Sequence, residues 1–299
     1  MTGSLLDWAL AARIGSSVAG EGEAADWAGP EPVALEAARA AALVVDYTAL
    51  DPGDTIPDAR SVDRASWVQA NLETLRGAVE LLEPRLAESL ELPGPLGAWL
   101  RALAGRFASA QAGLVVGYAG RRVLGQYELP IVGPPREPRL LFVAPNLTAA
   151  GRELDSEAPL LRWIALHEMT HAVNFGAVGW LRGHLSGLIE ELITTVEVST
   201  DASRLLEAAK SVLATDPRRL IAELRDVDPV TALAGPEQRR LIDLIQAAMT
   251  VIEGYAEHVM DAVGSRLDPD VARLRDGLER RRRARTAPRS PIQRPGCAA

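Results

Sequence analysis

Leu160-Leu-Arg-Trp-Ile-Ala-Leu-His-Glu-Met-Thr-His-Ala-Val-Asn-Phe175 combines an apolar helical pattern with the motif His-Glu-x-x-His. Apolar residues recur on most sides of this stretch, which predicts a buried helix. We expect the helix to begin after Ser156, a good N-cap residue, and to end near Phe175, where Gly176 suits a C-cap. Two histidines and a glutamate on a buried helix are costly unless a partner such as a metal ion satisfies them.

The spacing of the motif has a chemical meaning. His167 and His171 are four residues apart, so their imidazoles share one helix face and can reach one zinc ion. Glu168 follows the first ligand and is placed to act as general base, taking a proton from zinc-bound water as it attacks a carbonyl. The alternative is a surface helix with two unrelated histidines. It is weakened because the chain has only 4 histidines and two of them lie here.

A catalytic zinc site needs a third protein ligand. The long metzincin motif is excluded, because Asn174 and Ala177 stand where it requires glycine and histidine. A glutamate from a later helix is the other common solution, and we favour Glu253 over Glu190. Our reason is Gly254, which would let its helix approach the metal helix closely, whereas Glu190 lies in an acidic pair of an amphipathic helix. The remaining possibilities are Glu257 and the absence of a third protein ligand.

Other polar residues near these candidates have open roles. Tyr255 and His258 are candidates for stabilising an oxyanion, with packing as the alternative. Glu257 and Asp261 continue the stripe of Glu253 and could orient a metal-bound histidine, or they could form the solvated face of the helix. His184 lies in a glycine-rich connection, where a hydrogen-bonded structural histidine is the simpler interpretation.

Composition narrows the class of protein. The 299 residues carry a net charge of −8, which disfavours a general binder of nucleic acid or of anionic membranes. The single cysteine, Cys297, permits no intramolecular disulfide and no cysteine-based metal site. We see no signal peptide and no apolar stretch approaching the roughly 20 residues of a membrane span. We therefore expect a soluble cytoplasmic protein; its oligomeric state is left open.

The pattern along the chain predicts an α+β fold, predominantly α-helical, with a small β-sheet preceding the His-Glu-x-x-His helix. One domain is expected over residues 1–279, followed by a disordered Arg- and Pro-rich tail at 280–299. Within the domain we expect a helical part at 1–112, the sheet at 113–147 and the metal-site helices at 156–265.

Finer boundaries follow from periodicity and turn residues. Residues 139–144 are our candidate edge strand, against which an extended substrate backbone would pair. The other predicted strand segments are 114–116 and 125–129. The predicted helices are 5–18, 33–50, 64–92, 96–112, 187–213, 216–227 and 236–263.

With these residues in place, the chain resembles the zincin-like metallopeptidase type 2 family, in the branch associated with biosynthesis of coenzyme F-420. The resemblance covers roughly residues 5–265. It is carried by Leu124-Gly125-Gln126-Tyr127, Ala144-Pro145-Asn146-Leu147, the His-Glu-x-x-His motif, Trp180-Leu181-Arg182 and Glu253-Gly254-x-Ala256-Glu257.

The resemblance implies a helix-rich zincin-like fold, zinc at His167, His171 and Glu253, and Glu168 as base. The coenzyme association names no reaction, so it gives no substrate. One departure concerns the C-terminus: the family pattern continues with an ordered helical segment, whereas this chain turns Arg-rich from Arg280.

We therefore predict a zinc-dependent hydrolase, most simply a metallopeptidase acting on a peptide or amide substrate of unknown identity. The rival hypothesis is a non-catalytic binding or regulatory protein on the same scaffold, linked to deazaflavin coenzyme metabolism. The intact residues His167, Glu168 and His171 argue against it, because Glu168 has no evident value in a purely structural site.

Overall fold

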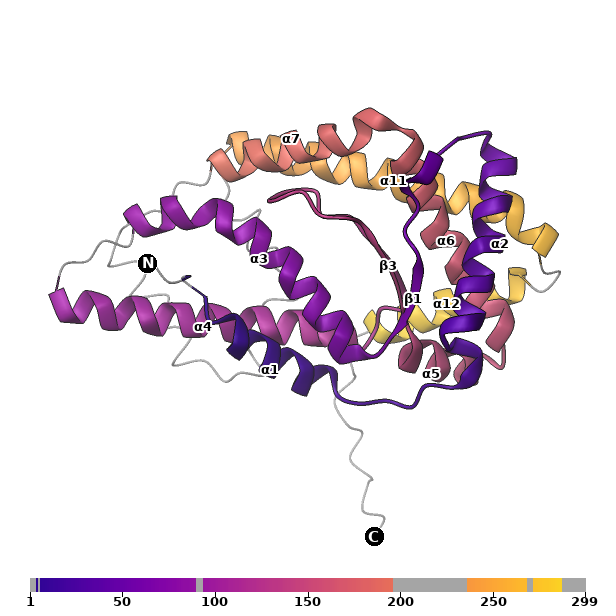
Figure 1. Ribbon diagram of the computed structural model, residues 1–299, viewed down its shortest axis with the longest axis horizontal. Coiled ribbons are helices and arrows are strands. Elements are labelled where there is room, and N and C mark those ends of the chain that lie inside the picture. Colours follow the sequence, from indigo (N-terminus) through magenta and orange to yellow (C-terminus); the bar gives the residue numbers. More distant parts are fainter. Residues whose placement is uncertain (1–3, 5, 90–93, 196–235, 268–270, 287–299) are drawn as a thin grey trace, which may run out of the picture.

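A computed structural model describes residues 4, 6–89, 94–195, 236–267 and 271–286 of the chain. Helices dominate and enclose one small sheet, so the predicted α+β, mainly helical class is confirmed (Figure 1). The helices are α1 (Trp8–Ala19), α2 (Pro30–Thr48), α3 (Arg64–Ser89), α4 (Gly94–Gly120), α5 (Ala144–Leu154), α6 (Glu157–Ala177), α7 (Gly179–Thr195), α11 (Pro236–Leu267) and α12 (Val271–Thr286), with short 3-10 turns at Asp26–Ala28 and Gly53–Thr55. No helix within the described residues is long and apolar enough to cross a membrane.

The sheet has three strands in the order β1-β3-β2. β1 (Ala59–Val62) pairs with β3 (Arg139–Val143) in parallel, and β2 (Gly125–Glu128) pairs with β3 in antiparallel fashion. The expectation that 139–144 forms an edge is therefore wrong, since β3 is the central strand and residue 144 already begins α5. β2 is an edge strand instead. Both faces of β3 are covered by helices, which agrees with its uninterrupted apolar run.

Helices cover both faces of the sheet. Leu140 and Phe142 of β3 belong to a core cluster with residues of α2, α5, α6 and α11. Leu141 and Val143 point the other way, into a second cluster with residues of α1 and α3. Side chains from the two faces of β3 thus contribute to both cores, and α6 belongs to the larger one.

The buried helix α6 begins after Ser156, as predicted, although the serine side chain makes no capping hydrogen bond. It ends at Ala177, and Val178 rather than Gly176 is its C-cap residue. Gly176 has a different role, because a Cβ there would lie 2.2 Å from Oγ1 of Thr55 and 3.0 Å from Pro52. α6 packs against α2, α5 and α11, so its histidines face other helices as well as the sheet.

Several predicted boundaries differ from those observed. Residues 114–116 lie within α4 and not in a strand. α7 begins at Gly179, so it includes His184, and is described to Thr195. Residues 280–286, predicted as the start of a disordered tail, lie in helix α12. The predicted helix at 216–227, the end of the one at 187–213 and residues 287–299 lie outside the described part of the chain.

Two glycines explain why the β-prone residues 114–116 are helical. A Cβ on Gly113 would lie 2.4 Å from the carbonyl oxygen of Ala11, and one on Gly117 would lie 2.4 Å from that of Gly15. The backbones of α1 and α4 therefore touch, and this packing overrides the local preference of the segment between the glycines.

We expect Gly117→Ala to destabilise the protein by about 1–3 kcal/mol, since the added methyl group meets backbone atoms that cannot turn aside. Gly187→Ala is the matched control. Gly187 lies exposed in α7 with nothing within 4 Å of an added Cβ, so the helix propensity of alanine should stabilise by about 0.5–1 kcal/mol. Urea denaturation of both variants measures the sign of the change in the free energy of unfolding for each. A Gly117→Ala variant as stable as the wild type would contradict the close packing.

Candidate metal centre

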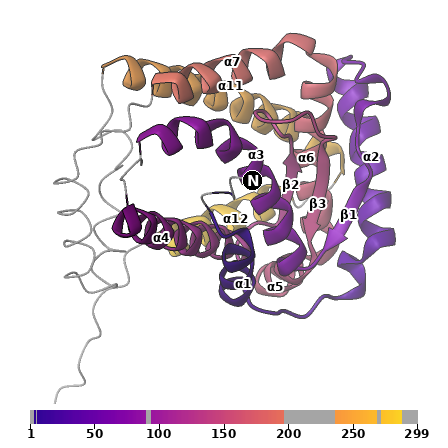
Figure 2. The same cartoon turned by 60° about the vertical axis from the view of Figure 1, so that its left-hand side comes forward.

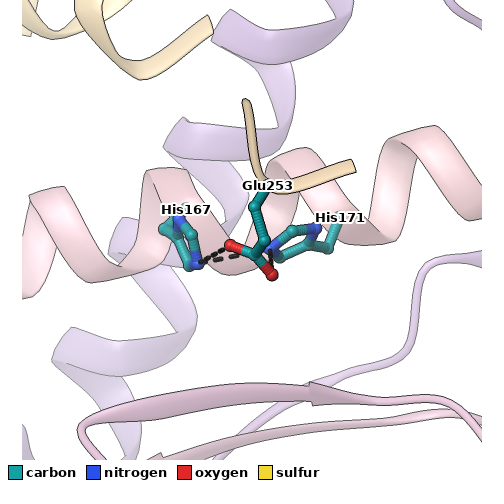
Figure 3. A group of neighbouring side chains, drawn as sticks. All are labelled: His167, His171 and Glu253. Atoms are coloured by element: carbon teal, nitrogen blue, oxygen red, sulfur yellow. Dashed lines mark hydrogen bonds and ion pairs between the residues drawn. The ribbon is translucent and has the colours of Figure 1, made fainter. Parts of the chain in front are cut away.

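α6 presents His167 and His171 on one face, one helical turn apart. Their Nε2 atoms lie 3.2 Å from each other, and the ring planes meet edge to face at 88° with centroids 4.6 Å apart. Figure 3 shows both rings projecting from α6 toward the same point. This is the arrangement that the i, i+4 spacing predicts.

Glu253 extends from α11 toward the Nε2 atoms of both histidines. Its carboxylate oxygens lie 3.7 Å from Nε2 of His167 and 3.6 Å from Nε2 of His171 (Figure 3). One ligand atom from each residue can be chosen so that all three lie within 4.8 Å of one another. Tetrahedral zinc with bonds of about 2.0–2.1 Å separates its ligand atoms by roughly 3.3 Å, so the observed spacings fit after shifts of a few tenths of an ångström.

The donor set also fits zinc chemically. Two imidazoles and one carboxylate are the ligands of many catalytic zinc sites, which keep one position open. The side chain of Glu253 is 50% exposed, so solvent reaches the group from the α11 side. Among the described residues, these three form the group of His, Cys, Asp or Glu side chains close enough to share an ion.

The other proposed third ligand lies elsewhere. Glu190 is exposed on α7, where it accepts a hydrogen bond from Ser186 at 3.2 Å. The geometry therefore favours Glu253, but the reason given from the sequence is wrong. A Cβ on Gly254 would meet nothing within 4 Å, so this glycine does not mediate a close helix contact. Glu253 reaches the histidines because its side chain projects from the face of α11 that packs on α6.

Glu168, the predicted base, is buried against the edge strand of the sheet. Its Oε2 accepts a hydrogen bond of 2.6 Å from the backbone N–H of Tyr127 in β2. Gly125 makes this approach feasible, since a Cβ there would lie 2.6 Å from Ile164 and 2.9 Å from Cγ of Glu168. Burial raises the pKa of Glu168 to about 8; the Tyr127 N–H opposes the rise and the charge of Glu253 adds to it.

The two histidines have different surroundings. Burial lowers the pKa of His171 to about 4, so its imidazole is neutral and available as a ligand at neutral pH. Nδ1 of His167 lies 3.1 Å from the sulfur of Met260, which is on α11 two turns beyond Glu253. A thioether thus stands where metal-bound histidines usually meet a carboxylate, carbonyl or water.

The remaining candidates have partners away from the three ligand side chains. Tyr255 packs against the larger core cluster near Tyr47 and Thr48 of α2, and Nε2 of His258 lies 3.2 Å from the hydroxyl of Tyr47, so both turn toward α2. Glu257 is exposed on α11. Their predicted roles toward an oxyanion or a bound histidine remain predictions.

Two more polar candidates have clear contacts. Asp261 pairs with Arg275 of α12, in agreement with a solvated face. His184, which lies in α7 and not in a connection, meets the ring of Trp180 edge to face.

Sequence reasoning assigned no role to Gly125, Tyr127 or Met260. The first two lie in the Leu-Gly-Gln-Tyr segment that carried the family resemblance. The resemblance drew attention to this segment but did not indicate its contact with Glu168. Met260 gave no comparable signal, since an apolar residue seven positions after Glu253 is what helix packing alone would place there.

The metal-free protein should lose stability as pH rises, because of Glu168. Its pKa is about 8 when folded and 4.5 in the reference state, so the neutral acid is favoured by folding. Stability from this group is therefore full below pH 4.5 and lost as pH rises toward 8. With 1.36 kcal/mol per pKa unit, the loss between pH 5 and pH 8 is about 3 kcal/mol.

Glu168→Gln should remove this slope, since glutamine keeps an oxygen for the Tyr127 N–H and cannot ionise. Urea denaturation of both metal-stripped proteins at pH 5 and pH 8 measures the difference. His171, whose lowered pKa costs stability as pH falls from 6.5 toward 4, is common to both and cancels. Equal pH dependence in the two proteins would show that Glu168 is not held neutral by the fold.

Comparison with known proteins gives independent evidence on the family of this chain. A family model described as zincin-like metallopeptidase matches residues 6–294. A crystal structure from Chloroflexus aurantiacus, described as a suggested hydrolase with a novel fold, superposes with a TM-score of 0.58 at 26% sequence identity. The alignment covers 94% of this chain and 76% of that one. No curated protein matches the sequence.

Proposed function

Because this chain belongs to the zincin-like metallopeptidase family, we propose that it is a zinc-dependent hydrolase that cleaves a peptide bond or another amide. In this proposal His167, His171 and Glu253 hold the metal and Glu168 is the general base. The observation that carries it is the convergence of three ligand atoms beside a buried carboxyl group that is fixed by a backbone N–H.

Zinc bound by these side chains would polarise the substrate carbonyl and acidify water for its attack. The chain's own contribution is to place the proton acceptor. The Tyr127 N–H orients the carboxyl group of Glu168, and burial holds its pKa near 8. A cation held by His167, His171 and Glu253 would lower that pKa toward neutrality, where a general base works best. Glu168 then takes a proton from water and passes it to the leaving amine.

β2 offers a place for an extended substrate. The Leu124 carbonyl accepts a hydrogen bond of 2.9 Å from the Val143 N–H, so the backbone polar groups of Leu124 point toward β3. Because these directions alternate along a strand, the backbone N–H and C=O groups of Gly125 and Tyr127 point away from β3, toward the open edge. Glu168 takes the outward N–H of Tyr127, which places the base at the strand edge. We propose that a substrate backbone pairs along this edge and brings its scissile carbonyl to the metal centre.

The direct test is zinc-dependent cleavage of a peptide library. Protein stripped with a chelator should cleave nothing, and addition of one equivalent of zinc should restore cleavage. The rival binding-protein hypothesis predicts that zinc-loaded protein cleaves no member while still binding the metal. The raised pKa and fixed orientation of Glu168 favour catalysis over that rival. The association with coenzyme F-420 and the cytoplasmic location remain predictions and give no substrate.

A further inference from the structure

Arg182 is a partly buried cation that, among the described residues, has one hydrogen-bond partner. It lies on α7, and one of its terminal N–H groups donates to the carbonyl of Pro130 at 2.9 Å. Within the described part of the chain, no carboxylate lies at ion-pair distance from it. A guanidinium has five N–H donors in a planar fork, so one carbonyl leaves most of them available.

Contacts link this cation to the metal centre. The ring of Tyr127 lies 6.0 Å from that of Phe175, which follows His171 by one turn of α6. The backbone of the same tyrosine holds Glu168. Arg182 is close enough to act on the Tyr127 hydroxyl: burial raises the pKa of Tyr127 to about 12, and the positive charge of Arg182 opposes that rise.

The position of Arg182 also matches the path proposed for the substrate. Pro130 lies two residues beyond the end of β2, so the guanidinium stands at the end of the strand edge along which an extended chain would pair. In Figures 1 and 2, α7 runs beside α11, the helix that supplies Glu253. Arg182 therefore stands at the end of β2, on a helix that packs against both metal-site helices, α6 and α11, where it can meet a substrate group that extends past the end of β2.

We infer that Arg182 binds a carboxylate of the substrate, so that this hydrolase acts on acidic peptides or amides. The inference rests on the proposed function and narrows its substrate class. Arginine matches the planar carboxylate with two parallel N–H···O bonds, and the partly buried position reduces competition from water. The carboxylate has two sources, the C-terminus of a peptide or an Asp or Glu side chain, and the experiment separates them.

Binding should be measured in zinc-loaded Glu168→Gln protein, which retains the site without turning over. The probes are two pairs of labelled hexapeptide pools, read by fluorescence anisotropy. One pair ends in a free carboxylate or an amide, and the other is amidated with Glu or Gln at one fixed position. We expect one acidic pool to bind about 10- to 100-fold more tightly than its neutral partner, as a charge-assisted hydrogen bond allows. The pair that discriminates identifies the source.

Adding Arg182→Gln should abolish this discrimination, and Arg182→Lys, which keeps the charge, should retain part of it. A merely structural role of Arg182 toward Pro130 would change the binding of acidic and neutral pools alike. Arg152, which lies on α5 and forms an exposed ion pair with Glu23, is the control: Arg152→Gln removes the same charge and should leave the discrimination intact.

Equal binding of acidic and neutral pools, no binding of any acidic pool, or discrimination that survives in Arg182→Gln would each overturn the inference. Failure of the proposed function is seen separately, as absence of zinc-dependent cleavage by the wild type. The binding measurement does not depend on turnover, so the two failures can be told apart.

Discussion

Glu168→Gln is expected to abolish hydrolysis and to leave the zinc content at about one ion per chain. Glutamine has the size of glutamate and can still accept the Tyr127 N–H, but it cannot take a proton from water. Loss of a general base typically lowers the rate by about 10²- to 10⁴-fold, so kcat/KM should fall by at least that much. Glu168 is not one of the proposed ligands, and the metal should therefore remain.

Two measurements on each protein test this result, kcat/KM on a cleaved peptide and zinc content by mass spectrometry. Glu157→Gln is the control, because Glu157 is an exposed glutamate in the first turn of the same helix and should tolerate the change. Activity above about a tenth of wild type in Glu168→Gln would remove Glu168 from the chemistry. Loss of zinc in that variant would instead make it a ligand.

The local part of the site could be predicted from the sequence because it depends on helix geometry alone. His167 and His171 come together through a four-residue spacing, which any α-helix converts into one shared face. The choice of Glu253 over Glu190 agrees with the geometry, yet it rested on the wrong residue. Which face of α11 packs on α6 is a tertiary fact, and a neighbouring glycine does not encode it.

The sheet shows where sequence reasoning failed. The strand Ala59-Arg-Ser-Val62 is short, lacks an apolar run and pairs with β3 across about eighty residues, so no local signal announces it. Without β1, β3 was predicted to be an edge strand. Its apolar run predicts that both faces are buried, but it carries no information on which edges are paired.

The groups that position Glu168 also could not be predicted from the sequence. They are a glycine and a backbone N–H, and neither contributes a side chain to a sequence pattern. Sequence patterns therefore report ligands more readily than the backbone groups that orient them.

Glu253→Ala should weaken zinc binding by at least about 100-fold, since partners that only orient a ligand already cost about 10- to 100-fold in metal affinity. Glu190→Ala, which removes an exposed glutamate from α7, should bind zinc like the wild type. Competition with a chromophoric chelator gives the three affinities. Zinc loss in Glu190→Ala with retention in Glu253→Ala would assign the third ligand to α7 and imply that α7 moves toward the histidines.

The free energy of unfolding of Glu253→Ala, with and without zinc, distinguishes the loss of a zinc ligand from damage to the fold. The Glu253 side chain is half exposed, so in metal-free protein its replacement by alanine should change the free energy of unfolding by no more than about 0.5 kcal/mol. Added zinc should then stabilise the wild type by about 4 kcal/mol at a thousand times its Kd, and the variant by much less at the same concentration. If metal-free Glu253→Ala were itself strongly destabilised, Glu253 would be holding α11 against α6. Equal stabilisation of both proteins by zinc would mean that His167 and His171 bind it without help from α11.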